Sequence, residues 1–322
     1  MVLFSKKVKK GVALRVSPVI VHTIQNLLGK VLNNFAGVIH MKKTIVAAAV
    51  AAVFAAPVAM ADVKISGAVQ FEAGEFDDNA GSTADSMNKI KTDITVSGSE
   101  DLGNGLKAGF KLTQTRDDQS AERTDEDAFI TLSNGTINAK MGSFEHYIES
   151  SIGGMAANDA SHDVSNEISD GESGTSAAGE SIEVNVSPMA GLTVGFQTGD
   201  NADTVYAAYS NAGLTVRVAS ENNASGEDVV GLAAQYKIDG LTLKAVTIDN
   251  DSGEAPEWYG ASYTMGANTI AASVVNGGST DGDTTLSLNH ALSKSTNVYL
   301  VLGTDDNAGG DDETVVGIKH KF

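Results

Sequence analysis

Carboxylates dominate the side chains of this chain that could do chemistry. The sequence holds 41 Asp and Glu against 22 Lys and Arg, with six His and no Cys. Covalent or acid–base catalysis needs a nucleophile beside a base, and a zinc site needs closely spaced ligands. No serine elbow or zinc-ligand spacing accompanies the histidines beyond residue 61, which are His146, His162, His290 and His320. The residue types therefore favour a role in which the side chains act through their charge rather than as catalytic groups.

Many of the acids gather in and just before one long stretch, residues 147–179. They are Glu145, Glu149, Asp159, Asp163, Glu167, Asp170 and Glu172. Lysines recur on patterned segments elsewhere, at Lys89, Lys91, Lys107, Lys111 and Lys140. If the two groups face each other across water, the transverse field orients dipolar solutes and rejects apolar ones. We treat Glu145, Glu149, Asp159 and Asp163 as the candidate acidic side and the five lysines as the candidate basic side.

The first 61 residues read as targeting sequence. Two lysines after Met41, an apolar core over residues 45–54 and small residues at Ala59 and Ala61 form a secretory signal, residues 41–61, with cleavage after Ala61. A mature membrane anchor is the alternative, but the core is short for a span. Residues 1–40 are interpreted as an upstream extension outside the mature product, with a bipartite targeting segment as the alternative.

Residues 62–322 are strongly acidic. The first 61 residues hold eight Lys and Arg and no acid, which leaves 14 basic and 41 acidic side chains and a formal charge of −27. Such a surface repels nucleic acid and attracts cations. Without cysteine, stability has to come from sheet closure or packing.

Short segments alternate between apolar and polar residues. Leu106, Ala108, Phe110 and Leu112 alternate with polar or small residues, and the pattern returns over residues 182–187, 192–197 and 230–238. Tight-turn pairs such as Asn104-Gly105 and Asp239-Gly240 separate the segments on one side, and long acidic connections separate them on the other. Counting the segments predicts about sixteen strands.

We therefore predict an all-β fold, a transmembrane antiparallel up-and-down β-barrel formed by residues 62–322. A soluble sandwich would also alternate, but its inner faces would carry more leucine and aromatic residues, and here aromatics are 6% of the chain. Several aromatics fall near strand ends and are expected in interfacial girdles, or for some of them in contacts between subunits: Phe71, Tyr206, Tyr209, Tyr236, Trp258, Tyr259, Tyr263 and Phe322.

Three segments resemble the Gram-negative general porins. They are residues 97–110, residues 62–67 and the ending at Phe322, where Ile318, His320 and Phe322 share one face of the last strand. The resemblance implies a homotrimer of sixteen-stranded barrels whose third extracellular loop, here residues 147–179 after a strand at 136–144, folds inward. It also implies that the terminal face is an assembly signal, met by periplasmic chaperones and the barrel assembly machinery. Where the family carries Arg or Gln after the closing glycine of that strand, this chain has Ser143.

The implied function is a water-filled, cation-preferring diffusion channel for ions and small hydrophilic solutes. It would lie in the cell outer membrane, in contact with the lipid bilayer and lipopolysaccharide. A solute-specific channel, a barrel enzyme and a secreted acidic adhesin are the alternatives. No cofactor is expected apart from Ca²⁺ or Mg²⁺ at acidic extracellular loops, since carboxylate oxygens are their usual ligands.

Overall fold

The computed structural model describes residues 62–75, 87–117, 124–156, 179–200, 202–223, 228–250, 255–277, 282–304 and 312–322. The chain divides into two units, residues 1–56 and residues 57–322, and every described residue belongs to the second. The predicted upstream extension and signal segment, residues 1–61, lie outside the described residues.

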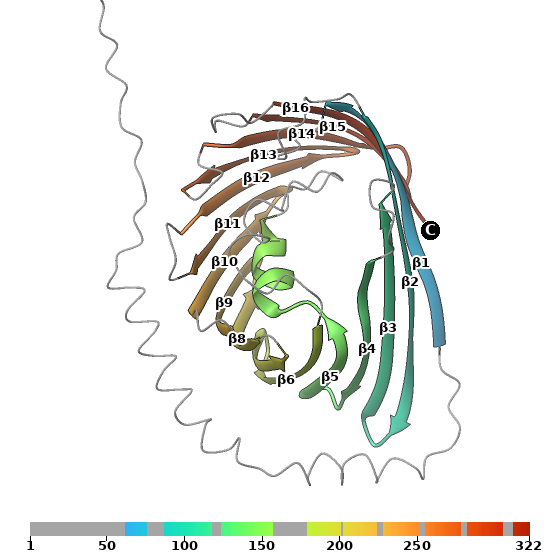
Figure 1. Cartoon of the computed structure of the whole chain (residues 1–322), viewed down its shortest axis with the longest axis vertical. Coiled ribbons are helices and arrows are strands. Elements are labelled where there is room, and N and C mark those ends of the chain that lie inside the picture. Colours follow the sequence, from blue (N-terminus) through green and yellow to red (C-terminus); the bar gives the residue numbers. More distant parts are fainter. Residues whose placement is uncertain are drawn as a thin grey trace, which may run out of the picture. The chain divides into compact units, whose positions relative to one another are not determined.

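Sixteen strands form one closed antiparallel barrel (Figure 1). They are β1 (Asp62–Glu75), β2 (Met87–Gly103), β3 (Leu106–Asp117), β4 (Thr124–Ser133), β5 (Ile137–Phe144), β6 (Gly179–Met189), β7 (Leu192–Gly199), β8 (Ala202–Asn211), β9 (Leu214–Asn223), β10 (Asp228–Ile238), β11 (Leu241–Asn250), β12 (Glu257–Met265), β13 (Asn268–Asn276), β14 (Thr284–Ala291), β15 (Thr296–Thr304) and β16 (Glu313–Lys321). Each strand pairs with its neighbours in sequence, and β16 pairs with β1, which removes both sheet edges. The predicted fold and strand number are confirmed.

Alternation along the strands decides which face is apolar. Residues that oppose each other across paired strands share a face, so Phe71 of β1 lies beside Ile90 of β2 and Ile318 of β16 on the outside. Large apolar side chains on this outer face are widely exposed, for example Ile65 at 65% and Ile130 at 56%. An exposed apolar belt around a closed barrel is the surface expected to face hydrocarbon.

Tight turns join the strands at one end of the barrel. Asn104 and Gly105 have φ of 53° and 79°, and Asp239 and Gly240 have 47° and 83°, the positive values that two-residue hairpin turns require. Ala212 takes φ of 47° in the turn between β8 and β9, although alanine rarely adopts this region. The longer connections all join strands at the other end, so the predicted asymmetry of the two ends is confirmed.

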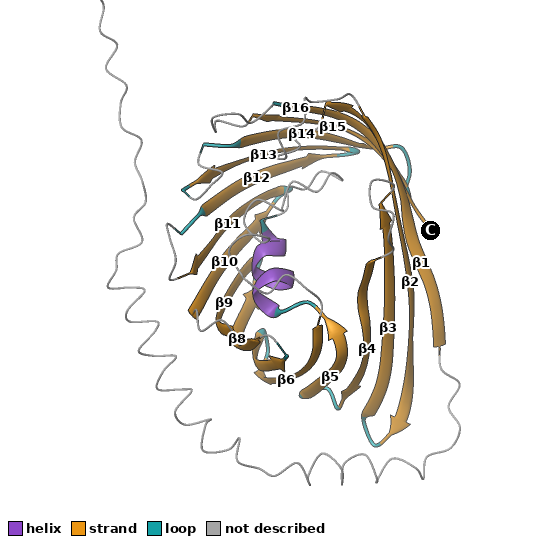
Figure 2. Ribbon diagram, viewed as in Figure 1, coloured by secondary structure: helices purple, strands orange, loops and turns teal. Residues whose placement is uncertain are grey.

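After β5 the chain turns into the barrel. One π-helical turn, η1 (Ile148–Ile152), and one 3-10 turn, η2 (Gly153–Met155), lie inside the ring of strands (Figure 2). The inward fold of the third long connection is confirmed as far as Ala156, and residues 157–178 lie outside the described ranges. No helix among the described residues is long and apolar enough to cross a membrane.

Two of the predicted girdle aromatics are placed elsewhere. Tyr209, Tyr236 and Tyr263 are exposed on the outer face near the tight turns, as expected. Tyr206 and Trp258 are instead buried on the inner face, at 3% exposure each. The prediction was wrong for these two because proximity to a strand end does not fix the face, which is set by register.

Candidate functional site

The described residues after β5, 145–156, are called the inward segment. One side of this segment is apolar and packs on the inner wall of the barrel. Ile148, Ile152 and Met155 are buried against the inner faces of β8 to β13. The wall residues of this cluster are Tyr206, Ala219, Val229, Ala233, Val246, Ile248, Trp258 and Val275. Full burial of each isoleucine stabilises the docked segment by roughly 1.5–3 kcal/mol relative to exposure to lumenal water.

Close contacts fix the position of the helical turns on this wall. A side-chain carbon added at Gly231 of β10 would lie 3.0 Å from the nearest Ile152 carbon, so the glycine lets the segment approach closely. The Tyr147 ring stacks on Tyr206 at 3.6 Å between centroids. Burial raises the pKa of Tyr147 to about 12, so its hydroxyl stays neutral at ordinary pH. At the far end of η1, Arg217 Nη1 donates to the Ser151 carbonyl.

A buried polar cluster holds the start of the segment. His146 Nδ1 lies 3.4 Å from Thr204 Oγ1 and 3.6 Å from Glu221 Oε2, and Thr204 donates to Glu221 at 2.9 Å. All three are at most 1% exposed. Burial lowers the pKa of His146 below its ordinary value, against the opposing charges of Glu221 and Asp203. The imidazole is therefore neutral at pH 7.

Gln197 of β7 makes a second polar anchor through its amide. Its Oε1 accepts the Tyr147 N–H at 3.0 Å, and its Nε2 donates to the Glu145 carbonyl at 3.3 Å. Because the Gln197 side chain is 1% exposed, both ends of the amide need these partners. The segment is thus hydrogen-bonded to β7 and β8, and lies against Glu221 of β9, before its first helical turn.

The segment shows a small surface away from the wall. Ser150 and Gly154 are exposed, while the predicted acidic residues Glu145 and Glu149 are only half-exposed. The other two predicted acids, Asp159 and Asp163, lie outside the described residues. Within the described part of the segment, its surface therefore consists mainly of small and weakly polar groups.

Two predicted basic residues come together on the facing wall. Lys111 of β3 forms an ion pair with Asp127 at 2.6 Å. Lys140 of β5 lies 3.9 Å from Glu183 of β6, and its Nζ sits 3.6 Å from the centre of the Phe144 ring. A cation over an aromatic face is stabilised by the ring quadrupole. Both positive charges are thus matched by carboxylates.

The other three predicted lysines lie at different heights on the inner face. Lys89 and Lys91 of β2 are opposite Glu72 and Gln70, toward the long connections. Lys107 is the second residue of β3, next to a tight turn. The barrel therefore does not bring the five lysines into one cluster.

The predicted assembly face lies on the outside of β16. Gly67 and Phe322 exchange two backbone hydrogen bonds, of 3.1 and 3.0 Å, so the last residue completes the closure of the barrel. Phe322 is 56% exposed, and its ring covers Gly67, where an added side-chain carbon would meet it at 2.7 Å. His320 Nδ1 lies 2.8 Å from Thr296 Oγ1.

Sequence reasoning missed Gln197, Thr204 and Glu221 as anchors of the inward segment. One signal was present in β10. Its consecutive residues Val229 and Val230 point to opposite faces, so the inner face as well as the outer face is apolar there. An apolar inner face in a water-filled barrel needs a cover.

Metal ligands do not gather in the part of the chain that the structure describes. There, no group of three or more His, Asp or Glu side chains could hold a metal ion. The acidic long connections, where Ca²⁺ or Mg²⁺ is expected, fall mostly outside the described ranges.

Comparison with known proteins agrees with this architecture. A mutant of the Rhodopseudomonas blastica porin is 17% identical, with a TM-score of 0.65 over 82% of this chain and 100% of its own. Salmonella typhi OmpF in complex with daunomycin is 17% identical, with a TM-score of 0.67 over 81% of this chain and 97% of its own. At such identities the likeness shows the fold alone, and no curated protein matches the chain. A family model described as Gram-negative porin, however, matches residues 47–310, most of the chain, and this protein therefore belongs to the Gram-negative porins, the outer-membrane channels.

Proposed function

We propose that this porin is a water-filled, cation-preferring channel for ions and small hydrophilic solutes, narrowed by the segment that follows β5. The observation that carries the proposal is the docking of that segment on the inner wall by an apolar cluster and by the His146, Gln197 and Arg217 contacts. A segment whose described part is held at both ends inside a closed barrel reduces the open cross-section.

Charge supports the cation preference. The lumenal bases Lys111 and Lys140 are matched by Asp127 and Glu183, so they add little net positive field. Residues 62–322 carry 41 acidic and 14 basic side chains, so an excess of negative charge remains. Negative potential in a narrow water-filled passage raises the local concentration of cations. Glu145 and Glu149 are the proposed acids of the constriction, with Asp159 and Asp163 further along.

The test is conductance of residues 62–322 refolded into planar bilayers, with the reversal potential measured under a KCl gradient. We expect ohmic steps and a reversal potential that reports K⁺ over Cl⁻. A correctly folded barrel that does not conduct would sink the channel proposal. A reversal potential favouring Cl⁻ would reject the cation preference alone.

The lysines provide a matched pair of variants for selectivity. Lys140→Gln removes a charge beside the docked segment, and Lys107→Gln removes the same charge next to a tight turn. We expect a larger rise in K⁺ preference for Lys140→Gln, because a charge acts most strongly where the passage is narrow. Equal shifts would place the constriction elsewhere.

We further propose a homotrimer, assembled from chains exported by the predicted signal and recognised through the Ile318, His320 and Phe322 face. Conductance steps that open and close in groups of three would support the trimer, and single steps would contradict it. The same proposal includes contact with lipopolysaccharide and binding of divalent cations at the acidic connections. A change in the thermal stability of the barrel on adding Ca²⁺ would test the cation binding.

A further inference from the structure

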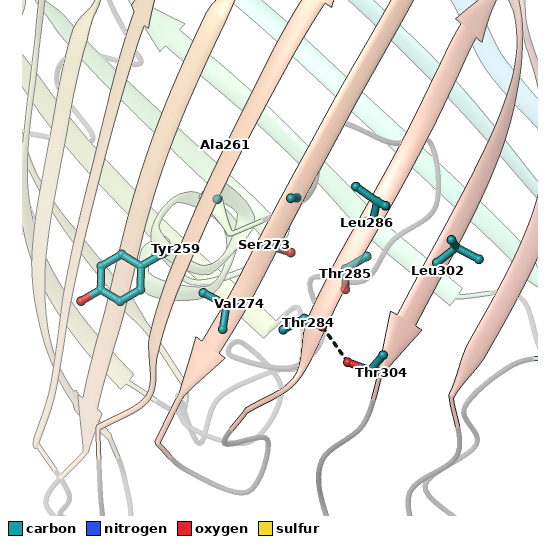
Figure 3. Close-up of a pocket in the computed structure, with 11 residues that line it drawn as sticks. Tyr259, Ala261, Ser273, Val274, Thr284, Thr285, Leu286, Leu302 and Thr304 are labelled. Atoms are coloured by element: carbon teal, nitrogen blue, oxygen red, sulfur yellow. Dashed lines mark hydrogen bonds between the residues drawn. The ribbon is translucent and has the colours of Figure 1, made fainter. Parts of the chain in front are cut away.

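A groove opens on the outer wall of the barrel, on β12 to β15 (Figure 3). Its volume is about 670 Å³. Two neighbouring rows of outward residues form it. One row is Ala261, Ala272, Leu286 and Leu302, and the other is Tyr259, Val274, Thr284 and Thr304.

Two adjacent alanines give the groove its depth. Ala261 and Ala272 oppose each other on β12 and β13, so the wall between them carries only methyl groups. Leu286, beside Ala272 on β14, is 49% exposed and stands above that level. Tyr259 flanks the alanines on the other row (Figure 3). The groove is therefore a local depression in an otherwise bulky apolar belt.

The hydroxyl groups of Thr284, Thr304 and Tyr259 in the groove already have hydrogen-bond partners. The Thr284 and Thr304 hydroxyls share a hydrogen bond of 2.6 Å, visible as the dashed line in Figure 3. Tyr259 donates its hydroxyl to Glu257 at 2.8 Å. These groups lie toward the strand ends that lead to the long connections, and the alanine floor lies deeper. The groove is thus apolar at its floor and polar at its rim. A membrane lipid has the same order, with apolar acyl chains deep in the membrane and polar groups nearer the surface.

Strand length sets the depth of the groove in a membrane. β12, β13 and β15 have nine residues each and β14 has eight. Tilted strands need about 9–11 residues to cross the hydrocarbon layer, so these four lie within it for their whole length. Long connections of such barrels are extracellular, which places the groove in the outer leaflet.

We propose that this groove binds one acyl chain of an outer-leaflet membrane lipid. The medium along the open side of the groove is hydrocarbon, continuous with the belt that surrounds the barrel. A flexible acyl chain can follow the irregular shape of the groove. Because a lipid tail is already out of water, its binding free energy comes from van der Waals contact with the groove. A second copy of the protein is the competing occupant.

The test fills the groove and counts retained lipid. Ala272→Trp places a ring on the floor, and Ala207→Trp makes the same change on the outer face of β8, away from the groove. Each protein is refolded in vesicles of dimyristoyl phosphatidylcholine and phosphatidylglycerol, extracted into detergent and weighed by native mass spectrometry. We expect one lipid retained by the parent and by Ala207→Trp, and at least a tenfold lower occupancy for Ala272→Trp.

Three results would overturn the proposal. The first is a parent protein that retains no lipid, and the second is an Ala207→Trp variant that loses lipid as fully as Ala272→Trp. The third is a disulfide between two copies of the Ala272→Cys variant, which would place a second copy at the groove; this readout is unambiguous because the chain has no other cysteine. Ala272→Leu, a smaller filling, serves if the tryptophan variant fails to fold, and a partial loss of lipid is then expected. Conductance of each folded variant should equal that of the parent, so the groove can fail while the channel proposal stands.

Discussion

At the scale of single residues, the buried contact between His146 and Glu221 depends on pH. Both side chains are buried, yet the imidazole is neutral because burial lowers its pKa more than the neighbouring carboxylate raises it. A protonated imidazole would have to lose its water to stay in place, so it fits the docked position poorly. The docked imidazole therefore stays neutral to a pH below the ordinary pKa of histidine, and protonating it opposes docking.

Acid should loosen the inward segment. A group with a depressed pKa in the docked state stabilises that state above its ordinary value of 6.5, and this contribution is lost as the pH falls below that value. Trp258, the single tryptophan, lies in the docking cluster and reports the release. Acrylamide quenching of Trp258 should rise between pH 7 and pH 5.

The control is His146→Gln, whose amide does not titrate. Its quenching should stay flat over the same range of pH. A parallel rise in the variant would show that another group is responsible, and Asp203 and Glu221 are the carboxylates that face the imidazole.

At the scale of elements, the inward segment behaves as a short helical turn with its own small core. Ile148 and Ile152 are fully buried although the turn has only five residues. A helix this short is not stable alone, so its conformation depends on the wall that it covers. Conversely, the apolar inner faces of β10 and β11 depend on the segment to exclude water.

Ile152→Ala should weaken the docking of the segment by about 2–5 kcal/mol, the usual cost of truncating a buried isoleucine. The readouts are Trp258 quenching and the noise of the open-channel current, both of which should increase. Ile130→Ala is the matched control, because Ile130 is 56% exposed on the outer face. The idea fails if the two variants behave alike.

Arg217→Met should loosen the far end of the segment while keeping the length of the side chain. It removes the charged donor to the partly buried Ser151 carbonyl, a type of hydrogen bond worth about 1.5–3 kcal/mol. Current fluctuations should grow in this variant. Lys107→Met also removes one inward charge but is placed next to a tight turn, and its traces should resemble the parent.

At the scale of the whole molecule, closure between β1 and β16 turns sixteen marginal strands into one stable sheet. The register from Ala68 opposite Lys321 to Glu75 opposite Thr314 joins the two ends of the barrel chain. Two further backbone bonds between Gly67 and Phe322 complete the seam. Because no edge remains among the described strands, every strand shares the stability of its neighbours.

Gly67→Leu should lower the temperature at which the folded barrel unfolds on a heated electrophoretic gel. A side chain at this position would meet the Asp93 carbonyl at 2.2 Å and the Phe322 ring at 2.7 Å. Val69→Leu, two residues along on the same outer face, enlarges a side chain that is already 45% exposed and should leave the temperature unchanged. An unaffected Gly67→Leu barrel would remove the seam from the account of stability.

The sequence by itself determined the strands and their closure. Alternation and tight-turn pairs such as Asn104-Gly105 are local patterns, so they can be recognised without knowing what each strand contacts. The even number of strands follows from counting the patterned segments. The outward apolar belt followed from the same period of two, whereas the inward fold of the third long connection, after β5, was implied only by the resemblance to the porins.

Only the tertiary structure decided how the inward segment is held. Gln197, Thr204 and Glu221 lie 50 or more residues from the backbone and side-chain groups that they contact at 145–147, so no local pattern joins them. The five lysines looked alike in sequence, yet register brings Lys111 and Lys140 together beside carboxylate partners and places the other three elsewhere on the inner face. Local periodicity sets the face on which a residue lies, whereas its partners depend on contacts across the barrel.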